Sequence, residues 1–571
     1  MSVRSRSWAL VSATVLVLSA AIAALGPAAA VASETGKIDW TPCHQELGPT
    51  FECGTLQVPL EYSSRGNQDS NSNEPQQISN SRDGRQISIA VARLLATDQR
   101  NRIGSIFINP GGPGGSGVDF VLFAGPFLFS ADVRAKFDIV GFDPRGIFRS
   151  TQLQCFGSPA EWAPFFLPFA FPSNAAEEKL QKAADAFLAG ACAERGGRII
   201  DHMSTANVAR DLDMLRAAVG DTRLTYAGYS YGSYLGVTYA NLFPGRVRAL
   251  IVDGVLDPIA WSTGTRREGD TVPFSTRLRS DQGAQATLQE FFRLCDAGTG
   301  CAFAPNSAQR FAALSERLKA SPLQLIDPAT GQVIEFNYSL LILNTLFAMY
   351  ASESWPFLAA FLADLEAIVG PAQLGASLDA LRETIGLNQR FADPTYRNNL
   401  EGFPGVACSD SDNPDSYKAW SRQGALADEQ FGYFGRIWTW VSSICAAWPG
   451  TDSGRYLGPF TRTTANPVLV IGNQFDPATR YQGAVTVSGL LPRSRLLTVH
   501  GWGHTSLFRS QCADAAVAAY LLRMTLPATG TVCEQDFIPF VPTTLALQQS
   551  SSSQARVRGQ LIPSGLARSG H

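Results

Sequence analysis

Residues 224–236 read Leu-Thr-Tyr-Ala-Gly-Tyr-Ser-Tyr-Gly-Ser-Tyr-Leu-Gly. This stretch begins with residues that favour a β-strand and continues with residues that favour a helix. Gly-x-Ser-x-Gly lies at the junction, with Ser230 between Gly228 and Gly232. A serine on a sharp strand-to-helix turn needs neighbours without a Cβ, and the helix directs its first N–H groups toward the serine. The stretch therefore predicts a nucleophile elbow.

Strands and helices alternate around this elbow. The run 205–219 repeats apolar residues at helical spacing, and another short apolar run follows the elbow helix at 249–254. This alternation predicts an α/β fold with a mostly parallel, doubly wound sheet. The other runs that predict strands of this sheet are 87–95, 103–108, 137–142, 466–472 and 494–499.

The alternation stops after Asp257, and about two hundred residues with mostly helical patterns follow. A helical insert between two strands of one sheet predicts a cap domain over an active site. The predicted division of the chain is a signal peptide at 1–32, the first part of the α/β core at 33–257, a helical cap at 258–465, the second part of the core at 466–542 and a disordered tail at 543–571.

The N-terminus has the composition of an export signal. Arg4 and Arg6 precede an apolar run at 8–25, and Ala30-Val31-Ala32 has the form of a cleavage site. These features predict a secreted protein that begins near Ser33; an uncleaved membrane anchor is the alternative. No later run is long and apolar enough to span a bilayer, so no membrane span is expected after cleavage.

Ten cysteines in an exported chain indicate disulfide bonds. Metal binding is the rival interpretation, but the chain has no C-x-x-C and only five histidines, so we expect no metal or other cofactor. The simplest hypothesis pairs neighbouring cysteines in order: Cys43 with Cys53, Cys155 with Cys192, Cys295 with Cys301, Cys408 with Cys445 and Cys512 with Cys533.

The net charge of −3 gives no electrostatic reason to expect nucleic acid or an anionic membrane as a partner. With 45% hydrophobic and 17% charged residues, the chain has the composition of a globular protein.

Two residues downstream of Ser230 complete a candidate catalytic triad. A serine hydroxyl needs a base to take its proton, and a carboxylate to hold that base. His504 lies in the loop after the last predicted strand, and Asp476 in the loop after the strand before it. Both loops open at the carboxyl edge of the sheet, and the order Ser, Asp, His is that of α/β-hydrolases. His500 competes for the role of the base, and Asp257 for that of the acid.

A second loop at this sheet edge supplies a candidate oxyanion hole. Residues 109–117 read Asn-Pro-Gly-Gly-Pro-Gly-Gly-Ser-Gly and follow a predicted central strand. We expect the oxyanion to be bound by the backbone N–H groups of Gly112 and of Tyr231, the residue after the nucleophile. The loop lacks the Gly-Lys-Ser/Thr ending of a phosphate-binding loop.

Three further segments allow a structural interpretation. Arg145 is interpreted as a member of a structural ion pair, and Asp211 and Asp213 as solvated side chains of their helix. The stretch 159–172 alternates proline with aromatic residues, which fits either a flap over the site or a packed loop.

The glycine loop, the elbow and the segments Phe475-Asp476-Pro477 and Gly503-His504 together resemble the secreted tripeptidyl aminopeptidase branch of the prolyl-aminopeptidase-like serine peptidases. Trp40-x-x-Cys43 and Phe51-Glu52-Cys53-Gly54 are also similar to secreted members of that branch. Classical prolyl aminopeptidases have a histidine where this chain has Pro110, which favours the tripeptidyl branch. The resemblance extends from about Lys37 to Cys533 and is weak through the cap.

The resemblance implies a secreted exopeptidase that releases short peptides, with tripeptides expected, from the free N-termini of peptides or proteins. It also implies acidic groups under the cap that bind the substrate amine, and Asp410 is similar to the aspartate of a Cys-x-Asp segment there. A surface turn is the other interpretation of that segment. Two rival functions are a secreted carboxylesterase or lipase with the same triad and a catalytically silent binding protein on a hydrolase fold.

Overall fold

The computed structural model describes residues 36–47, 51–62, 84–326, 333–367, 372–373, 398 and 400–541. The predicted signal peptide and C-terminal tail lie outside these residues. Among the described helices, none combines the length and the hydrophobicity that a bilayer crossing requires.

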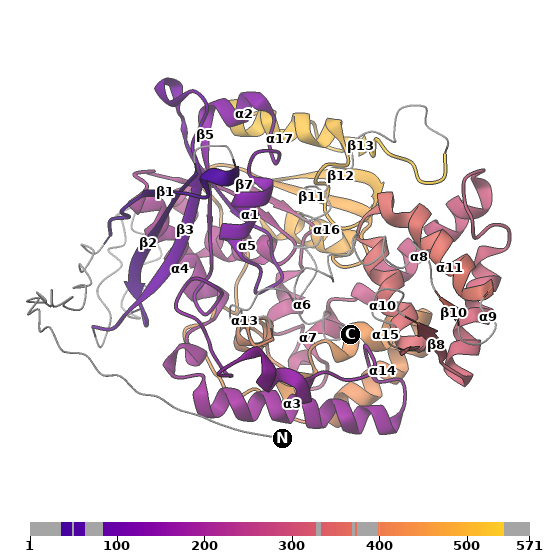
Figure 1. Cartoon of the computed structure of the whole chain (residues 1–571). Helices are drawn as coiled ribbons and strands as arrows, with labels where there is room; N and C mark the ends of the chain where they lie inside the picture. The colour runs from indigo at the N-terminus through magenta and orange to yellow at the C-terminus, as the bar shows by residue number, and fades with distance from the viewer. Residues whose placement is uncertain are drawn as a thin grey trace, which may run out of the picture.

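One large mixed sheet forms the centre of the molecule (Figure 1). The first three strands and β5 pair antiparallel, and from β5 to β13 all neighbouring strands are parallel. The predicted α/β fold with a mostly parallel sheet is therefore confirmed. In spatial order the strands are β1 (Thr41–Cys43), β2 (Phe51–Pro59), β3 (Gln86–Leu94), β5 (Phe137–Phe142), β4 (Gly104–Asn109), β6 (Leu224–Tyr229), β7 (Val247–Asp253), β11 (Val468–Phe475), β12 (Ser494–Trp502) and β13 (Val532–Glu534).

Helices cover both faces of the sheet, which is why its central strands are apolar throughout. Every residue of β4, β5 and β6 is buried. Alternate side chains such as Ile106 and Phe107 enter two separate hydrophobic cores. Helices α1 (Gly117–Ala124), α2 (Ala131–Lys136) and α17 (Gln511–Arg523) line one core, and α4 (Thr205–Ala218), α5 (Tyr231–Leu242) and α16 (Tyr481–Leu490) line the other.

Between β7 and β11 the chain leaves the sheet and forms the segment 258–465, called the insert below. Its long helix α8 buries Ala284, Leu288, Phe291 and Cys295, which are three or four residues apart. A small sheet of β8 (Leu323–Ile326), β9 (Val333–Phe336) and β10 (Ala372–Gln373) was not predicted. The main helices are α6 (Pro258–Ser262), α7 (Phe274–Arg277), α8 (Ser280–Ala297), α9 (Ser307–Ala320), α10 (Tyr338–Met349), α11 (Trp355–Ala367), α13 (Gly402–Asp410), α14 (Tyr417–Phe431) and α15 (Gly435–Trp440).

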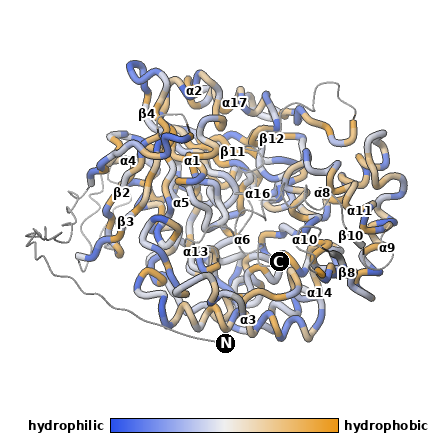
Figure 2. The backbone as a smooth tube through the Cα atoms, viewed as in Figure 1, coloured by the Kyte–Doolittle hydropathy of each residue, from blue (hydrophilic) through white to orange (hydrophobic). Residues whose placement is uncertain are grey.

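A second excursion from the sheet packs against the insert. Helix α3 (Ala175–Arg195) precedes the elbow in sequence but lies beside α14 (Figure 1). Glu178 of α3 accepts hydrogen bonds from Ser421 and Arg436. Hydrophilic and hydrophobic residues alternate along α3, as expected for a helix with one packed face (Figure 2).

The proline- and aromatic-rich stretch 159–172 packs into this same layer. Trp162, Phe165, Phe169 and Phe171 are buried, and the Phe171 ring makes an edge contact with Tyr338 of α10. These contacts favour the packed loop over the flap.

All ten cysteines form disulfides, and the neighbours pair in the predicted order. The bonds link chain segments that are 6 to 37 residues apart. Disulfides are typical of proteins exposed to an oxidising compartment.

Candidate active site

Ser230 occupies the turn between β6 and α5 in a strained backbone conformation, with φ 57° and ψ −127°. A non-glycine residue in this region is rare and persists only where its surroundings hold it. The predicted need for glycine on both sides is confirmed. A Cβ at Gly228 would lie 2.2 Å from the carbonyl oxygen of Gly232, and a Cβ at Gly232 would lie 2.6 Å from that of Asn109.

Asp476 and His504 meet at the carboxyl ends of β11 and β12. Both are buried, with 0% and 1% of their surface exposed. His504 Nδ1 lies 2.9 Å from Asp476 Oδ2 and 3.0 Å from Oδ1. This contact fixes the orientation of the imidazole and leaves Nε2 as the nitrogen that can exchange a proton elsewhere.

Asp476 is held as a charged group. Its oxygens accept from the backbone N–H groups of Ala478 and Thr479 at 2.8 Å and from Thr479 Oγ1 at 2.8 Å. Burial alone would raise the pKa of this carboxyl, but the charge and hydrogen bond of His504, with those two N–H groups, bring its pKa below the ordinary value.

The other histidine nitrogen, Nε2 of His504, is buried and has no hydrogen-bond partner among the described residues. Ser230 is buried as well, with 4% of its surface exposed. A Cβ at Gly254, just after β7, would lie 3.2 Å from His504 Cε1, so close packing on this side depends on a glycine. Hydrogen bonds between nucleophile and base are often long or absent before a substrate binds.

The glycine-rich loop 109–117 lies directly against the nucleophile. A Cβ at Gly111 would be 2.8 Å from Ser230 Cβ and 2.9 Å from the backbone nitrogen of Tyr231. Gly111 has φ +98°, which also favours glycine. Sequence reasoning chose Gly112 and missed this contact of Gly111. A Cβ at Gly112 would instead meet Gly114 and Gly115 of the same loop.

Asp410 ends α13 and is buried, so it is not part of a surface turn. Its carboxylate accepts from the Thr205 N–H at 2.7 Å, from Thr205 Oγ1 at 2.6 Å and from Trp261 Nε1 at 3.3 Å. The Thr205 hydroxyl also hydrogen-bonds the Tyr231 hydroxyl. The cluster thus joins the insert to the start of the elbow helix. Burial, only partly offset by the hydrogen bonds, raises the pKa of Asp410 to about 7.

His500 and Asp257, the alternative candidates for base and acid, make structural contacts elsewhere. His500 is on β12, with 43% of its side chain exposed, and its Nδ1 lies 2.8 Å from Glu534 Oε2. Asp257 accepts hydrogen bonds from the N–H groups of Ile259 and Ala260 and so caps α6.

The interpretation of Asp211 and Asp213 as solvated is wrong. Asp211 is fully buried and receives two hydrogen bonds from Arg145, at 2.7 and 2.6 Å. Asp213 is buried and pairs with Arg216 and Arg246. Helical periodicity gives the direction of a side chain but not the arginines that reach it from distant segments. The structural ion pair proposed for Arg145 is confirmed.

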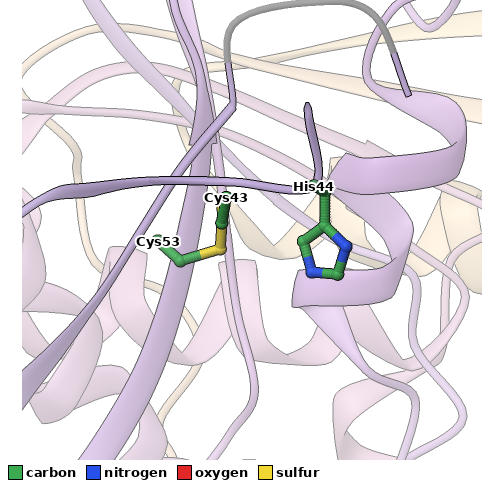
Figure 3. Close-up of side chains that lie close together, drawn as sticks. All are labelled: Cys43, His44 and Cys53. Carbon is green, nitrogen blue, oxygen red and sulfur yellow. A yellow bond between two sulfur atoms is a disulfide. The ribbon is translucent and has the colours of Figure 1, made fainter. Parts of the chain in front are cut away.

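One cluster of potential metal ligands occurs among the described residues, formed by Cys43, His44 and Cys53. Figure 3 shows that the two cysteines are joined in a disulfide, so neither offers a thiolate. His44 Nδ1 lies 3.1 Å from Glu46 Oε1. This cluster therefore gives no basis for a metal site.

Residues of the insert that contact the site were missed by sequence reasoning. The backbone carbonyl oxygen of Tyr350 accepts a hydrogen bond from the backbone N–H of His504 at 2.9 Å. The rings of the two residues also make an edge contact, with centroids 5.1 Å apart. No local pattern connects residues 154 positions apart. Thr479, in contrast, follows Asp476 by three residues, and a turn after Asp-Pro is a signal that sequence reasoning could have used.

Two segments of the chain match known protein families. Residues 104–285 match the family described as alpha/beta hydrolase fold, and residues 429–533 match TAP-like protein. The first match contains Ser230 and the glycine loop, and the second contains Asp476 and His504.

Three curated proteins are similar over most of the chain. Serine protease Hip1 of Mycobacterium tuberculosis is 30% identical over 550 residues, which cover 92% of this chain and 97% of that protein. Tripeptidyl aminopeptidase of Streptomyces lividans is 29% identical over 523 residues, which cover 90% and 89%. Carboxylesterase B of Mycobacterium tuberculosis is 30% identical over 513 residues, which cover 86% and 89%.

Proposed function

Since the chain belongs to the α/β-hydrolase family of serine protease Hip1 and the Streptomyces tripeptidyl aminopeptidases, we propose that this serine hydrolase is a secreted exopeptidase that releases tripeptides from free N-termini. The contact between His504 and Asp476, at the sheet edge that carries Ser230, is the observation that carries the catalytic part of the proposal. The Asp410 cluster carries the amine-binding part.

The proposed reaction is acyl transfer. His504 Nε2 takes the proton of Ser230 Oγ, which attacks the carbonyl carbon of a peptide bond near the substrate N-terminus. His504 then gives this proton to the leaving amine, and the C–N bond breaks. A water molecule, deprotonated by the same histidine, releases the N-terminal fragment from Ser230. Asp476 orients the imidazole and stabilises its positive charge throughout.

The oxyanion is proposed to bind the N–H groups of Tyr231 and Gly112. Tyr231 is the first residue of α5, so its N–H is among those left free at the helix start. The contact of Gly111 with Ser230 and Tyr231 supports the placement of the glycine loop at this point. Each donor of this kind is worth roughly 3 kcal/mol of transition-state stabilisation.

Recognition of a chain end is supported by the enclosure of the site and by Asp410. Ser230, His504 and Tyr231 are each at most 4% exposed, which is unsuited to a folded protein as substrate. A substrate ammonium group would supply a cation beside Asp410, which has no ion pair among the described residues. We propose that the insert acts as a cap and that α13 carries the amine-binding residue.

Secretion is proposed from the predicted signal peptide and is supported by the disulfides. A carboxylesterase with the same triad is the second candidate, because a relative of that name covers most of the chain. An ester substrate has no ammonium group, so Asp410 distinguishes the two functions.

The test uses purified mature protein and its Ser230→Ala variant. Each is incubated with an unblocked peptide and with its N-acetylated twin, and the products are identified by mass spectrometry. Tripeptides released from the unblocked peptide alone, and absent with the variant, would support the proposal. Hydrolysis of short acyl esters without cleavage of either peptide would support the carboxylesterase instead.

A further inference from the structure

His504 lies in a loop whose backbone is strained on its C-terminal side. Gly503 has φ +109°, Thr505 φ +65° and Phe508 φ +61°. Non-glycine residues keep such angles only where neighbouring groups determine them. The position of the His504 ring thus depends on what holds residues 503–508 in place.

Asp253, the last residue of β7, holds this loop from the sheet. Its carboxylate accepts from the Ser506 N–H at 2.9 and 3.0 Å and from Ser506 Oγ at 2.7 Å. Its backbone carbonyl accepts the Ser230 N–H at 2.9 Å. One residue therefore contacts both the elbow and the loop of the proposed base.

The surroundings of Asp253 make its charge costly. It is 1% exposed, and no lysine or arginine pairs with it among the described residues. Asp476 and His504 face it from the site, and Asp514 of α17 and Tyr229 of β6 from the other side. Burial, opposed by the hydrogen bonds of Ser506, raises the pKa of Asp253 to about 6. The hydrogen bonds from Ser506 are therefore what stabilises the charged form of this buried carboxylate.

We propose that Asp253 is a positioning residue that fixes His504 relative to Ser230 through its three hydrogen bonds to Ser506. The inference rests on the proposed function, because it assigns His504 to the reaction at Ser230. Asp253 itself contacts no reacting atom. Asn473 and Arg509 donate to carbonyl oxygens of residues 503–505, and the Asp253 carboxylate holds Ser506 and so ties the loop to the strand that contacts the elbow.

The test compares Asp253→Asn and Ser506→Ala with the wild type at pH 5 to 8, using an unblocked peptide and a short acyl ester. At pH 8 we expect kcat of Asp253→Asn to fall about 10- to 100-fold with little change in KM, because a shift of the base of about 1 Å has that effect. Ser506→Ala should lose about tenfold or less. The ratio of wild-type to Asp253→Asn kcat should shrink toward one at pH 5, because the wild-type carboxyl is then protonated as well.

The matched control is Asp185→Asn, a buried carboxylate of α3 that accepts from Gln181 and Ser443 away from the site. It should leave kcat per folded molecule unchanged at every pH. Unchanged kcat of Asp253→Asn at pH 8 would overturn the proposal, as would unchanged kcat in Ser506→Ala if Asp253→Asn does not fold. Hydrolysis by Ser230→Ala would instead contradict the proposed function, so the two failures are distinguishable.

Discussion

Asp476 and Asp410 are both buried aspartates near the elbow, but their pKa values move in opposite directions. Asp476 ends up below its ordinary pKa, and Asp410 rises to about 7. Both accept hydrogen bonds from a backbone N–H and from a threonine hydroxyl. The difference is the partner: Asp476 faces His504, whereas no lysine, arginine or histidine acts on Asp410 among the described residues.

The protein itself therefore provides a partner for the Asp476 carboxylate, whereas it provides no cation for the Asp410 carboxylate. Asp476 is charged because the protein itself supplies the group that it stabilises. Asp410 lacks such a group, and in the proposed function the substrate ammonium supplies it.

The largest effect is expected for Asp476→Asn, which removes the charge that orients His504. We expect kcat to fall about 10⁴-fold on unblocked peptides and on acyl esters alike. The measurement is steady-state kinetics on both substrates, with circular dichroism as a control for folding. A loss confined to peptides would assign Asp476 to substrate binding rather than to the triad.

The disulfide Cys408–Cys445 anchors α13 two residues before Asp410. Replacing both cysteines with serine removes a crosslink across 37 residues, which is worth about 4 kcal/mol of unfolding free energy. Peptidase activity should fall more than esterase activity, because only the Asp410 side is loosened. Urea unfolding and the two assays check this; equal losses of both activities would show that α13 also supports the triad.

A third prediction concerns the pH dependence of stability. Below pH 7 the folded protein protonates Asp410, whereas the unfolded chain does so only near pH 4. The folded state therefore binds more protons in this window, and its unfolding free energy gains from this residue as the pH falls from 8 to 5. The gain should be about 2–3 kcal/mol. Asp476, whose pKa is lowered, adds nothing in this window.

Urea unfolding of the wild type and Asp410→Asn at pH 8 and pH 5 isolates this contribution. The wild type should show the additional stabilisation at pH 5, and the variant should lack it. Identical pH dependence in the two proteins would mean that Asp410 is ionised in the folded state at pH 5.

The smallest effect is expected for Thr205→Val, which deletes the hydrogen bonds of the Thr205 hydroxyl to Asp410 and to the Tyr231 hydroxyl. The ionised carboxylate loses a donor, so kcat/KM on unblocked peptides should fall about tenfold near neutral pH. Ester hydrolysis should fall less than peptide cleavage, because it depends on Tyr231 but not on Asp410. Thr205→Ser keeps the hydroxyl and should restore peptide cleavage; failure of this rescue would point to packing of the threonine methyl group instead.

Features that depend on neighbouring residues follow from the sequence. The elbow and the positions of Asp476 and His504 follow from strand ends and local turns, which depend on neighbouring residues. The central strands from β3 to β7, β11, β12 and the order of disulfide pairing were likewise predicted, whereas β13 and the small sheet of the insert were not. The domain division and the catalytic roles stay predictions.

Contacts between distant segments could not be predicted in this way. Asp211 is buried because Arg145, 66 residues away, neutralises it. Asp410 is buried because Thr205, 205 residues away, donates to it. The close approach of Gly111 to Ser230 depends on the path of the whole loop, which a glycine pattern does not specify.

The role of Asp410 in binding the substrate amine is tested most directly by the preference for an unblocked peptide over its N-acetylated twin. This preference is measured as the ratio of the two kcat/KM values, in the wild type and in Asp410→Asn. We expect a large ratio in the wild type that falls about 100-fold or more in the variant, because the ion pair with the substrate amine is lost. Ester hydrolysis should be retained. An unchanged ratio in a folded, esterase-active Asp410→Asn would contradict the assignment of the two aspartates.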